Sequence, residues 1–369
     1  MIDFELLLAS LMLLPIIVDL LLLLVWLFKK EKVEERQQLL PFVSVLVAVR
    51  NEEKNIQRCI EGLTALNYPK DRLEILIGDD DSRDNTFRVI SKYIAKYNHV
   101  FLFKITGNLT GQKGKANVLA QLSQKAKGEY LFFTDADIKV PRNWIEEMLN
   151  GFQDNIGLVS GVTAIEGEDY AARFQLLDWV FALGMVKVVN QLGYSVTAIG
   201  NNMAIRRAAY DAVGGYENIP FSITEDLEML KQIRKKGFLA NQLFSEQVLA
   251  WSMPEQGFKN LLRQRKRWMK GAVQLPRGMV AILFFQALFF PLFLLLLLLN
   301  LNLALSIWIL KILIQSAFIK YSLSQLEKNE KLIHLVLYEL YSVALSLSLV
   351  VYFFLPAPVV WKDRKYNSL

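Results

Sequence analysis

Residues 41–53 read PFVSVLVAVRNEE, a Val-rich apolar run between a proline and a polar cluster. Such a run is typical of a strand that is buried on both faces of a sheet. Three similar runs follow, and they read LEILIGDDD, VFLFKI and EYLFFTDAD. Segments with helical spacing separate them, at residues 55–66, up to about residue 97, and at 115–128, where Gly128 is expected to close the helix. This alternation predicts an α/β fold with a mostly parallel sheet flanked by helices.

Polar residues follow three of the four predicted strands. The clusters are Arg50 with Asn51 and Glu52, residues 79–81, and Asp135 with Asp137. Any one cluster could consist of helix N-caps or turn residues. In open α/β sheets, however, ligands bind outside the carboxyl ends of the strands, so three clusters at one edge indicate a binding site.

The remaining sequence narrows the chemistry of that site. Neither a Gly-x-Gly-x-x-Gly run after the first strand nor a Walker-type phosphate loop occurs in the sequence. The two histidines, His99 and His334, lie away from every cluster, which excludes a Ser-His-Asp hydrolase and a histidine zinc site. The chemistry that remains possible for this site is that of its carboxylate groups.

Asp135 and Asp137 could hold a metal ion. Two carboxylates at the end of an apolar strand suit a hard cation such as Mg²⁺ or Mn²⁺. Magnesium shares its remaining positions with water and substrate phosphates, which suits a nucleotide diphosphate. An Asp-x-Asp pair is common by chance, and its position at a strand end gives it weight.

A second carboxylate pair opens a predicted helix over residues 221–237. Thr224 is the expected N-cap, and Glu225 and Asp226 fall in the first turn. The helix dipole stabilises an anion there, and an ionised carboxylate is the form that a general base requires. Simple helix capping is the alternative.

Residues 257–275 have the spacing of a strongly amphipathic helix. Gln264, Arg267 and Trp268 are spaced i, i+3 and i+4, so they project from one side. Arginine can grip a diphosphate and tryptophan can stack on a sugar. The helix could equally be a basic interfacial helix leading into a membrane, and both interpretations can hold together.

The hydropathy of the chain predicts membrane segments. The composition is 53% hydrophobic with a mean hydropathy of +0.27, and long apolar stretches cover residues 5–28, 279–319 and 332–355. The expected organisation is an N-terminal anchor at 1–30, a soluble domain at 31–277, and a C-terminal membrane region with two or three spans and a basic tail at 278–369. Asp19 within the first stretch is expected to pair with a polar group of a neighbouring helix.

Charge and cysteine content indicate the side of the membrane. Asp3 and Glu5 precede the first stretch and lysines follow it, so the positive-inside tendency places the soluble domain in the cytosol, with a bacterial inner membrane fitting best. The single cysteine, Cys59, fits a reducing compartment. The net charge of +6 comes from residues that are dispersed or beside membrane segments, so it predicts no nucleic-acid partner.

The C-terminal topology stays open. An outside N-terminus and four spans would put the basic tail, with Lys362, Arg364 and Lys365, outside as well, against the positive-inside tendency. Either Pro291 divides the second apolar block into an interfacial helix and one span, or the tail is an exception.

Taken in order, the motifs resemble those of the membrane-embedded family 2 glycosyltransferases, the group that includes cellulose and hyaluronan synthases and ceramide glucosyltransferases. The motifs are VSVLVAVRNEE, GDDDSRDNT, GQKGKANVLA, FTDAD, TED and QRKRW, within residues 40–275. The resemblance implies a GT-A-type nucleotide-binding fold.

The resemblance also implies roles for the residues of these motifs. On the donor side, Glu52 and Asp80 would hold the base and ribose, with Lys115 near the nucleotide. Asp135 and Asp137 would match the metal motif for Mg²⁺ or Mn²⁺, with Asp137 as the direct ligand.

On the acceptor side, Asp226 beside Glu225 would be the general base. The residues of the QRKRW motif, Gln264, Arg267 and Trp268, would close over the diphosphate and the acceptor. Asn201 and Asn202 would either contact acceptor hydroxyls or serve packing alone.

One departure from the family pattern lies in the second motif. Asp81 stands where the family usually has glycine, and Arg83 stands where it usually has threonine. These replacements leave the conformation of the loop and the donor preference open.

The implied reaction is the inverting transfer of a sugar from a nucleotide-sugar donor, with a UDP-sugar as the default, to a membrane lipid or lipid-linked glycan. A processive polysaccharide synthase is the alternative within the enzymes. A non-catalytic subunit that binds nucleotide sugars is the alternative from another class.

Overall fold

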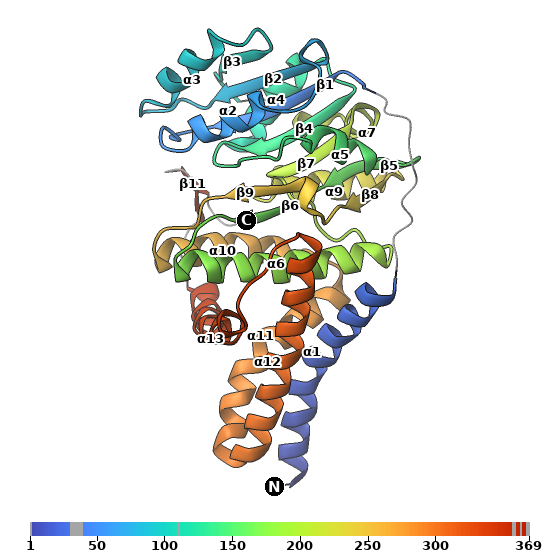
Figure 1. Ribbon diagram of the computed structural model, residues 1–369, viewed down its shortest axis with the longest axis vertical. Helices are drawn as coiled ribbons and strands as arrows, with labels where there is room; N and C mark the ends of the chain where they lie inside the picture. The colour runs from blue at the N-terminus through green and yellow to red at the C-terminus, as the bar shows by residue number, and fades with distance from the viewer. Residues whose placement is uncertain (1, 30–39, 109–110, 356–358, 362–363, 367–369) are drawn as a thin grey trace.

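The computed structural model describes residues 2–29, 40–108, 111–355, 359–361 and 364–366. An α/β domain occupies one end of the molecule and long helices extend from it at the other end (Figure 1). Two further helices lie between these parts.

The main sheet has the order β3-β2-β1-β4-β7-β5-β8. Its strands are β1 (Val43–Val49), β2 (Leu73–Asp79), β3 (Val100–Lys104), β4 (Tyr130–Asp135), β5 (Ile156–Ser160), β7 (Asn202–Arg206) and β8 (Leu239–Gln242). Strands β1 to β4 are parallel to one another, whereas β7 is antiparallel to both β4 and β5. The predicted mostly parallel sheet is confirmed.

Short helices flank the sheet, and the helices predicted between the first four strands are present. They are α2 (Ile56–Thr64), α3 (Thr86–Ile94), α4 (Lys115–Lys125), α5 (Trp144–Asn150), α7 (Arg207–Ala212), α8 (Gly215–Asn218) and α9 (Glu225–Lys235), with 3₁₀ turns at Lys70–Arg72 and Glu246–Val248. Strand β1 shows why they form two layers. Val45 and Val47 pack into the core on one face of the sheet and Leu46 into the core on the other.

The expectation that Gly128 closes α4 is wrong. The helix ends at Lys125, and the chain then passes close to β1. A Cβ atom at Gly128 would lie 2.4 Å from the backbone nitrogen of Ser44, and the Gly128 N–H donates to the Ser44 hydroxyl at 2.7 Å. Glycine is therefore needed here for close approach.

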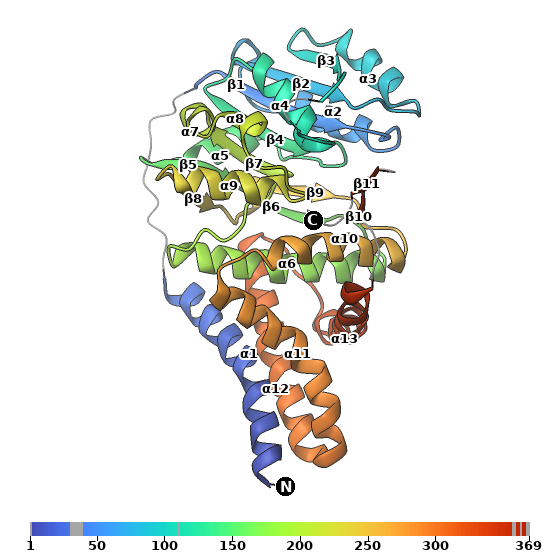
Figure 2. The ribbon, with the colours of Figure 1, turned by 180° about the vertical axis from the view of Figure 1, so that it is seen from behind.

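Two amphipathic helices lie side by side beneath the domain (Figures 1 and 2). They are α6 (Tyr170–Gln191) and α10 (Phe258–Ala272), and we call them the platform. Strand β6 (Val162–Ile165) precedes α6 in the chain, and strand β9 (Leu249–Ser252) precedes α10. The two strands pair in a small parallel sheet. Helix α10 was expected from the sequence and α6 was not, although Asp169 caps α6 by accepting from the Ala172 N–H at 2.8 Å.

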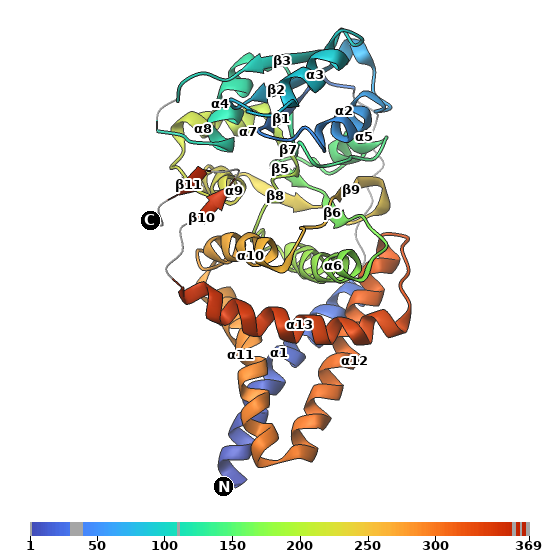
Figure 3. The same ribbon diagram turned by 90° about the vertical axis from the view of Figure 1, so that its left-hand side faces the viewer.

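Four further helices are long and apolar enough to cross a membrane. Helices α1 (Ile2–Phe28), α11 (Arg277–Leu299) and α12 (Leu301–Gln325) pack on one another and run away from the platform, whereas α13 (Leu332–Phe354) lies across it (Figure 3). A hairpin of β10 (Val359–Trp361) and β11 (Arg364–Tyr366) follows.

The structure settles two questions about the apolar segments. Helix α11 continues through Pro291, so this proline does not divide it. The Gln286 side chain donates to Asp19 at 3.1 Å, which confirms the expected pairing between α1 and a neighbouring helix.

The close approach at Gly128 gives a stability prediction. Gly128→Ala should lower the melting temperature of the detergent-solubilised protein strongly, because the new methyl group would push β1 away from the turn before β4. Gly278→Ala is the matched control, since no atom lies within 4 Å of a Cβ there and alanine favours the helix. Equal melting temperatures for the two variants would contradict this account.

Candidate active site

The three polar clusters meet at the carboxyl edge of the sheet. In the strand register Val49 lies beside Asp79, and Ala48 lies beside Asp135. Glu52 is buried and accepts from the Asn55 side chain at 2.9 Å. The sheet therefore brings these residues together at one edge, as predicted.

Cys59 on α2 reports on the charge of this edge. Its thiol is buried and lies 3.5 Å from the Asp135 carbonyl oxygen. Burial raises the pKa of Cys59, and the carboxylates of Asp137, Asp135 and Glu52 raise it further. The carboxylates of Asp135, Asp137 and Glu52 are therefore all close enough to the Cys59 thiol to affect its pKa.

Lys115 joins residues from three segments of the chain. Its Nζ lies 2.7 Å from Asp135 Oδ1 and 2.9 Å from Glu225 Oε1, and it reaches the Gly200 carbonyl at 3.4 Å. Burial lowers the pKa of Lys115, but the Asp135 and Glu225 carboxylates outweigh burial and raise it overall. The ammonium group is thus held in its charged form between the end of β4 and the beginning of α9.

Asp226 lies next to this ion pair in the first turn of α9. Its Oδ2 accepts from the Gly200 N–H at 2.9 Å, and its Oδ1 accepts from the Leu227 N–H at 2.8 Å. Burial and the Glu225 carboxylate raise the pKa of Asp226 to about 6, although Lys115 and the two N–H donors lower it. A carboxylate with this pKa can take up and release a proton near neutral pH.

Thr224 occupies the N-cap position of α9 as expected, but it makes no capping hydrogen bond. Its hydroxyl instead lies 3.2 Å from that of Ser222. Thr224 therefore does not cap α9, and it is Asp226 that accepts from an N–H group of the first turn.

Asp135 and Asp137 have the chemistry of a site for Mg²⁺ or Mn²⁺. Both are partly exposed at the sheet edge, and their side chains offer only oxygen ligands. Within the described residues, no group of three or more acidic, histidine or cysteine side chains forms a complete cage. Two carboxylates nevertheless suit a cation that keeps several waters and binds substrate phosphates.

The loop after β2 has the conformation that a glycine would favour. Asp81 has φ of +57° and Asn51, which lies across the edge, has φ of +52°. Asp and Asn tolerate this left-handed region better than other non-glycine residues. The buried Arg50 supports the loop by donating to the carbonyl groups of Asp80 and Asp81. Asp81 therefore keeps the backbone turn despite the absence of glycine.

The QRKRW residues lie on the platform and take different positions. The side chain of Gln264 donates to Glu255 at 2.9 Å, and Trp268 packs edge-on against Trp179 of α6, with ring centroids 5.1 Å apart. Arg265 holds both, since it donates to Gln264 Oε1 at 3.0 Å and lies 4.1 Å above the Trp268 ring. Among the described residues, no side chain forms an ion pair or hydrogen bond with Arg267, so its guanidinium is open to a ligand.

Arg265 and α6 are the parts of this region that the sequence did not single out. Asp178 of α6 accepts from Arg265 at 2.5 Å and from the Tyr338 hydroxyl at 3.2 Å. A signal in the sequence was Asp178, the one acidic residue of this 22-residue helical segment.

Asn202 has a packing role. It is fully buried, it accepts from the Trp144 indole at 2.8 Å, and its amide donates to the carbonyl groups of Val162 and Val248. Asn201 differs, since among the described residues its side chain accepts from the Thr163 hydroxyl alone, at 2.9 Å.

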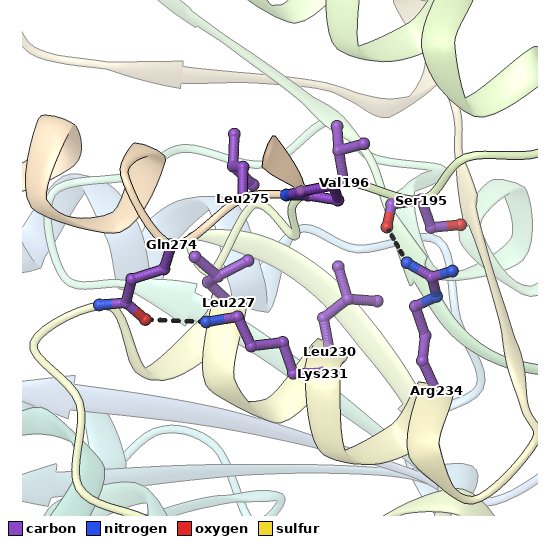
Figure 4. A pocket seen from close by; sticks show the side chains of 9 residues that line it. Ser195, Val196, Leu227, Leu230, Lys231, Arg234, Gln274 and Leu275 are labelled. Atoms are coloured by element: carbon purple, nitrogen blue, oxygen red, sulfur yellow. Dashed lines mark hydrogen bonds between the residues drawn. The ribbon is translucent and has the colours of Figure 1, made fainter. Parts of the chain in front are cut away.

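A separate cavity of about 290 Å³ lies on the other side of α9 (Figure 4). Val196, Leu227 and Leu275 form its apolar part, while Lys231 donates to Gln274 at 2.8 Å and Arg234 to the Ser195 carbonyl at 2.9 Å. The cavity is lined by none of the carboxylates described above. Its polar contacts join α9 to the segment between α10 and α11 and to the segment that follows α6.

The sheet topology, the acidic edge and the platform define a glycosyltransferase of the GT-A type. The chain belongs to glycosyl transferase family 21, whose family model matches residues 7–368. This family is related to the ceramide glucosyltransferase-like enzymes, so the resemblance to that group is confirmed.

The relatives of known activity are synthases. The chain is 29% identical over 247 residues to a beta-monoglucosyldiacylglycerol synthase of Trichormus variabilis, which covers 65% of this chain and 51% of the relative. It is 27% identical over 243 residues to a poly-beta-1,6-N-acetyl-D-glucosamine synthase of Staphylococcus epidermidis, which covers 65% of this chain and 56% of the relative. The chain thus spans about half the length of these curated relatives.

A solved structure has the same fold over almost the whole chain. It is the mannosyltransferase PcManGT from Pyrobaculum calidifontis, solved in complex with GDP-Man and Mn²⁺. The TM-score is 0.64 at 17% identity, and the match covers 95% of this chain and 98% of that one. The similarity includes the membrane-directed helices as well as the α/β domain.

The two asparagines give a test of packing at the site. Asn202→Ala should destabilise the protein by about 2–4 kcal/mol, because the Trp144 indole and two buried carbonyl groups would lose their partners. Asn201→Ala should cost roughly 1 kcal/mol, since a single hydroxyl loses its acceptor. Chemical denaturation of both variants in detergent measures the difference, and a larger effect of Asn201→Ala would contradict the assignment.

Proposed function

We propose that this protein transfers a sugar from a nucleotide-diphosphate sugar to a membrane lipid or lipid-linked glycan, with inversion at the anomeric carbon. The observation that carries the proposal is the position of Asp226. This carboxylate lies beside the Lys115 ion pairs at the sheet edge, with a pKa raised to about 6. A UDP-sugar is the first donor to test.

The proposed reaction is a single displacement. Asp226 takes the proton of the acceptor hydroxyl, the acceptor oxygen forms a bond to the anomeric carbon, and the bond from that carbon to the diphosphate oxygen breaks. No covalent enzyme intermediate is required. Glu225 and Lys115 set the charge around the base, and the free guanidinium of Arg267 would bind the departing diphosphate.

The donor would lie along the sheet edge. Glu52 and Asp80 would contact the base and ribose, with Lys115 near the nucleotide. Asp137, with Asp135, would hold a Mg²⁺ or Mn²⁺ ion, which when bound neutralises charge on the diphosphate. The mannosyltransferase that shares this fold was solved with Mn²⁺.

A lipid acceptor is supported by the place of the site in the molecule. The α/β domain stands directly on the platform, from which the apolar helices extend (Figure 2). A hydroxyl at the membrane surface would therefore be near Trp268, which lies on the platform helix α10. The glucosyldiacylglycerol synthase among the relatives has a name that describes such an acceptor.

A processive polysaccharide synthase is the second candidate. The relatives named poly-beta-1,6-N-acetyl-D-glucosamine synthase favour it. The three bundled helices offer little material for a polymer channel, so we place it second. Product length separates the two candidates.

We also place the catalytic domain on the cytosolic face of a bacterial inner membrane. The lysines after the first apolar stretch, the single cysteine and the need for a nucleotide-sugar donor all support this orientation.

Substitution of the proposed base tests the function. The purified protein in mixed lipids should release nucleotide diphosphate from one preferred donor of a panel that includes UDP- and GDP-sugars. Asp226→Asn should lower this release about 10²–10⁴-fold while nucleotide binding persists, because only proton removal is lost. Mass spectrometry of the lipid fraction counts the sugars added.

The controls distinguish the base from its neighbours. Glu228→Gln changes a carboxylate one turn further along α9 and should leave release within a few-fold of wild type. Asp137→Asn should abolish the stimulation by added Mn²⁺ or Mg²⁺. Binding of nucleotide without release from any donor would overturn the proposal and favour a non-catalytic subunit.

The raised pKa of Asp226 predicts the pH dependence of the reaction. Since the base acts when ionised, kcat/KM should fall as the pH drops through about 6. Glu225→Gln removes an anion that raises this pKa, so it should move the acidic limb to lower pH. A limb that stays in place or moves upward would show that Asp226 is not the titrating group.

A further inference from the structure

Helix α13 has the length and composition of a membrane span, but residues of the platform and the α/β domain contact both of its ends. In the short connection just before it begins, Lys328 pairs with Glu246 at 2.9 Å and Glu330 pairs with Arg173 of α6 at 2.9 Å. At its end, Lys266 of α10 donates to the carbonyl groups of Tyr352 and Leu355, at 3.1 and 2.6 Å. The two ends therefore lie on the same side of the molecule.

This arrangement is incompatible with crossing. The 23 residues of α13 span about 34 Å at 1.5 Å per residue, which is about the thickness of a bilayer core. A crossing helix would carry one end to the far side, beyond reach of α6 or α10. Helix α13 instead runs beneath both platform helices and across the direction of α1, α11 and α12 (Figure 3).

The side chains of α13 divide into two faces. The face toward the protein buries polar groups, among them Tyr338, which donates to Asp178, and Glu339, which is 1% exposed. Glu339 accepts from Lys311 of α12 at 2.8 Å and from the Trp308 indole at 2.9 Å. These bonds satisfy polar groups that would be costly in hydrocarbon and fix α13 to the bundle.

The opposite face is apolar and exposed. Its residues recur at helical spacing, and they are Leu332, Val336, Leu340, Val351 and Phe354. Helix α13 lies beside the ends of the apolar helices that leave the platform (Figure 3). An exposed apolar face bordering spanning helices fits the hydrocarbon of a bilayer.

We propose that α13 lies in the plane of the membrane, with its apolar face in the leaflet nearest the catalytic domain, and that α1, α11 and α12 alone cross. The C-terminal tail then lies on the same side as the catalytic domain. This placement removes the conflict with the positive-inside tendency, since Lys362, Arg364 and Lys365 come to the side where cations are favoured.

Cysteine labelling with a membrane-impermeant maleimide tests the topology. One variant carries a cysteine after Leu369, Lys235→Cys marks the catalytic side, and Asn302→Cys marks the turn between α11 and α12. In vesicles of known orientation, the added C-terminal cysteine should be labelled under the conditions that label Lys235→Cys. Labelling together with Asn302→Cys would show that α13 crosses and would overturn the proposal.

The native protein supplies the blank, because its single cysteine, Cys59, is buried. The test compares sides within one protein, so its result does not depend on the donor, the acceptor or any activity.

Spin labels on α13 provide an independent measurement. Labels at Val336, Leu340 and Val351 should show similar accessibility to oxygen and to a polar nickel complex, because an in-plane helix keeps its outward face at one depth. A depth that changes steadily along the helix by most of the bilayer thickness would contradict the proposal.

Discussion

Three carboxylates surround one ammonium group at the carboxyl edge of the sheet. Asp135, Glu225 and Asp226 bring their carboxylate groups to one place, and a cation among them offsets the repulsion between like charges. Lys115 provides that cation through two ion pairs of 2.7 and 2.9 Å. Because these residues come from β4, α4 and α9, the same contacts that balance the charge also fix the relative position of three elements.

The platform depends on a second set of polar contacts. Arg265 of α10 pairs with Asp178 of α6, and Trp268 of α10 packs edge-on against Trp179 of α6, so a charge pair and an aromatic contact join the two platform helices. Tyr338 extends this connection to α13. Helix α10 thus lies between the α/β domain and the apolar helices, and it carries Gln264, Arg267 and Trp268.

Polar residues within the apolar helices follow the same physical rule. Asp19 accepts from Gln286, and Lys311 pairs with Glu339, so the helices are joined where a lone charge would be costly. These pairs set which helices are neighbours in the bundle. Hydropathy alone treats all four long helices as equal, whereas the polar pairs and the contacts at their ends distinguish them.

The sequence by itself determined the alternating strands and helices, the acidic strand ends and the membrane segments, because local spacing and apolar runs encode these features directly. It also supplied the motif order that carries the family, although helix α6 and the end of α4 were missed. Only the tertiary structure decided that Lys115 bridges Asp135 and Glu225, that Asn202 serves packing, and that both ends of α13 return to the platform. The reason is that these features depend on contacts between residues far apart in the chain, such as Lys115 with Glu225 and Lys266 with Tyr352, or on the direction of a helix, and neither is recorded in the local pattern of residues.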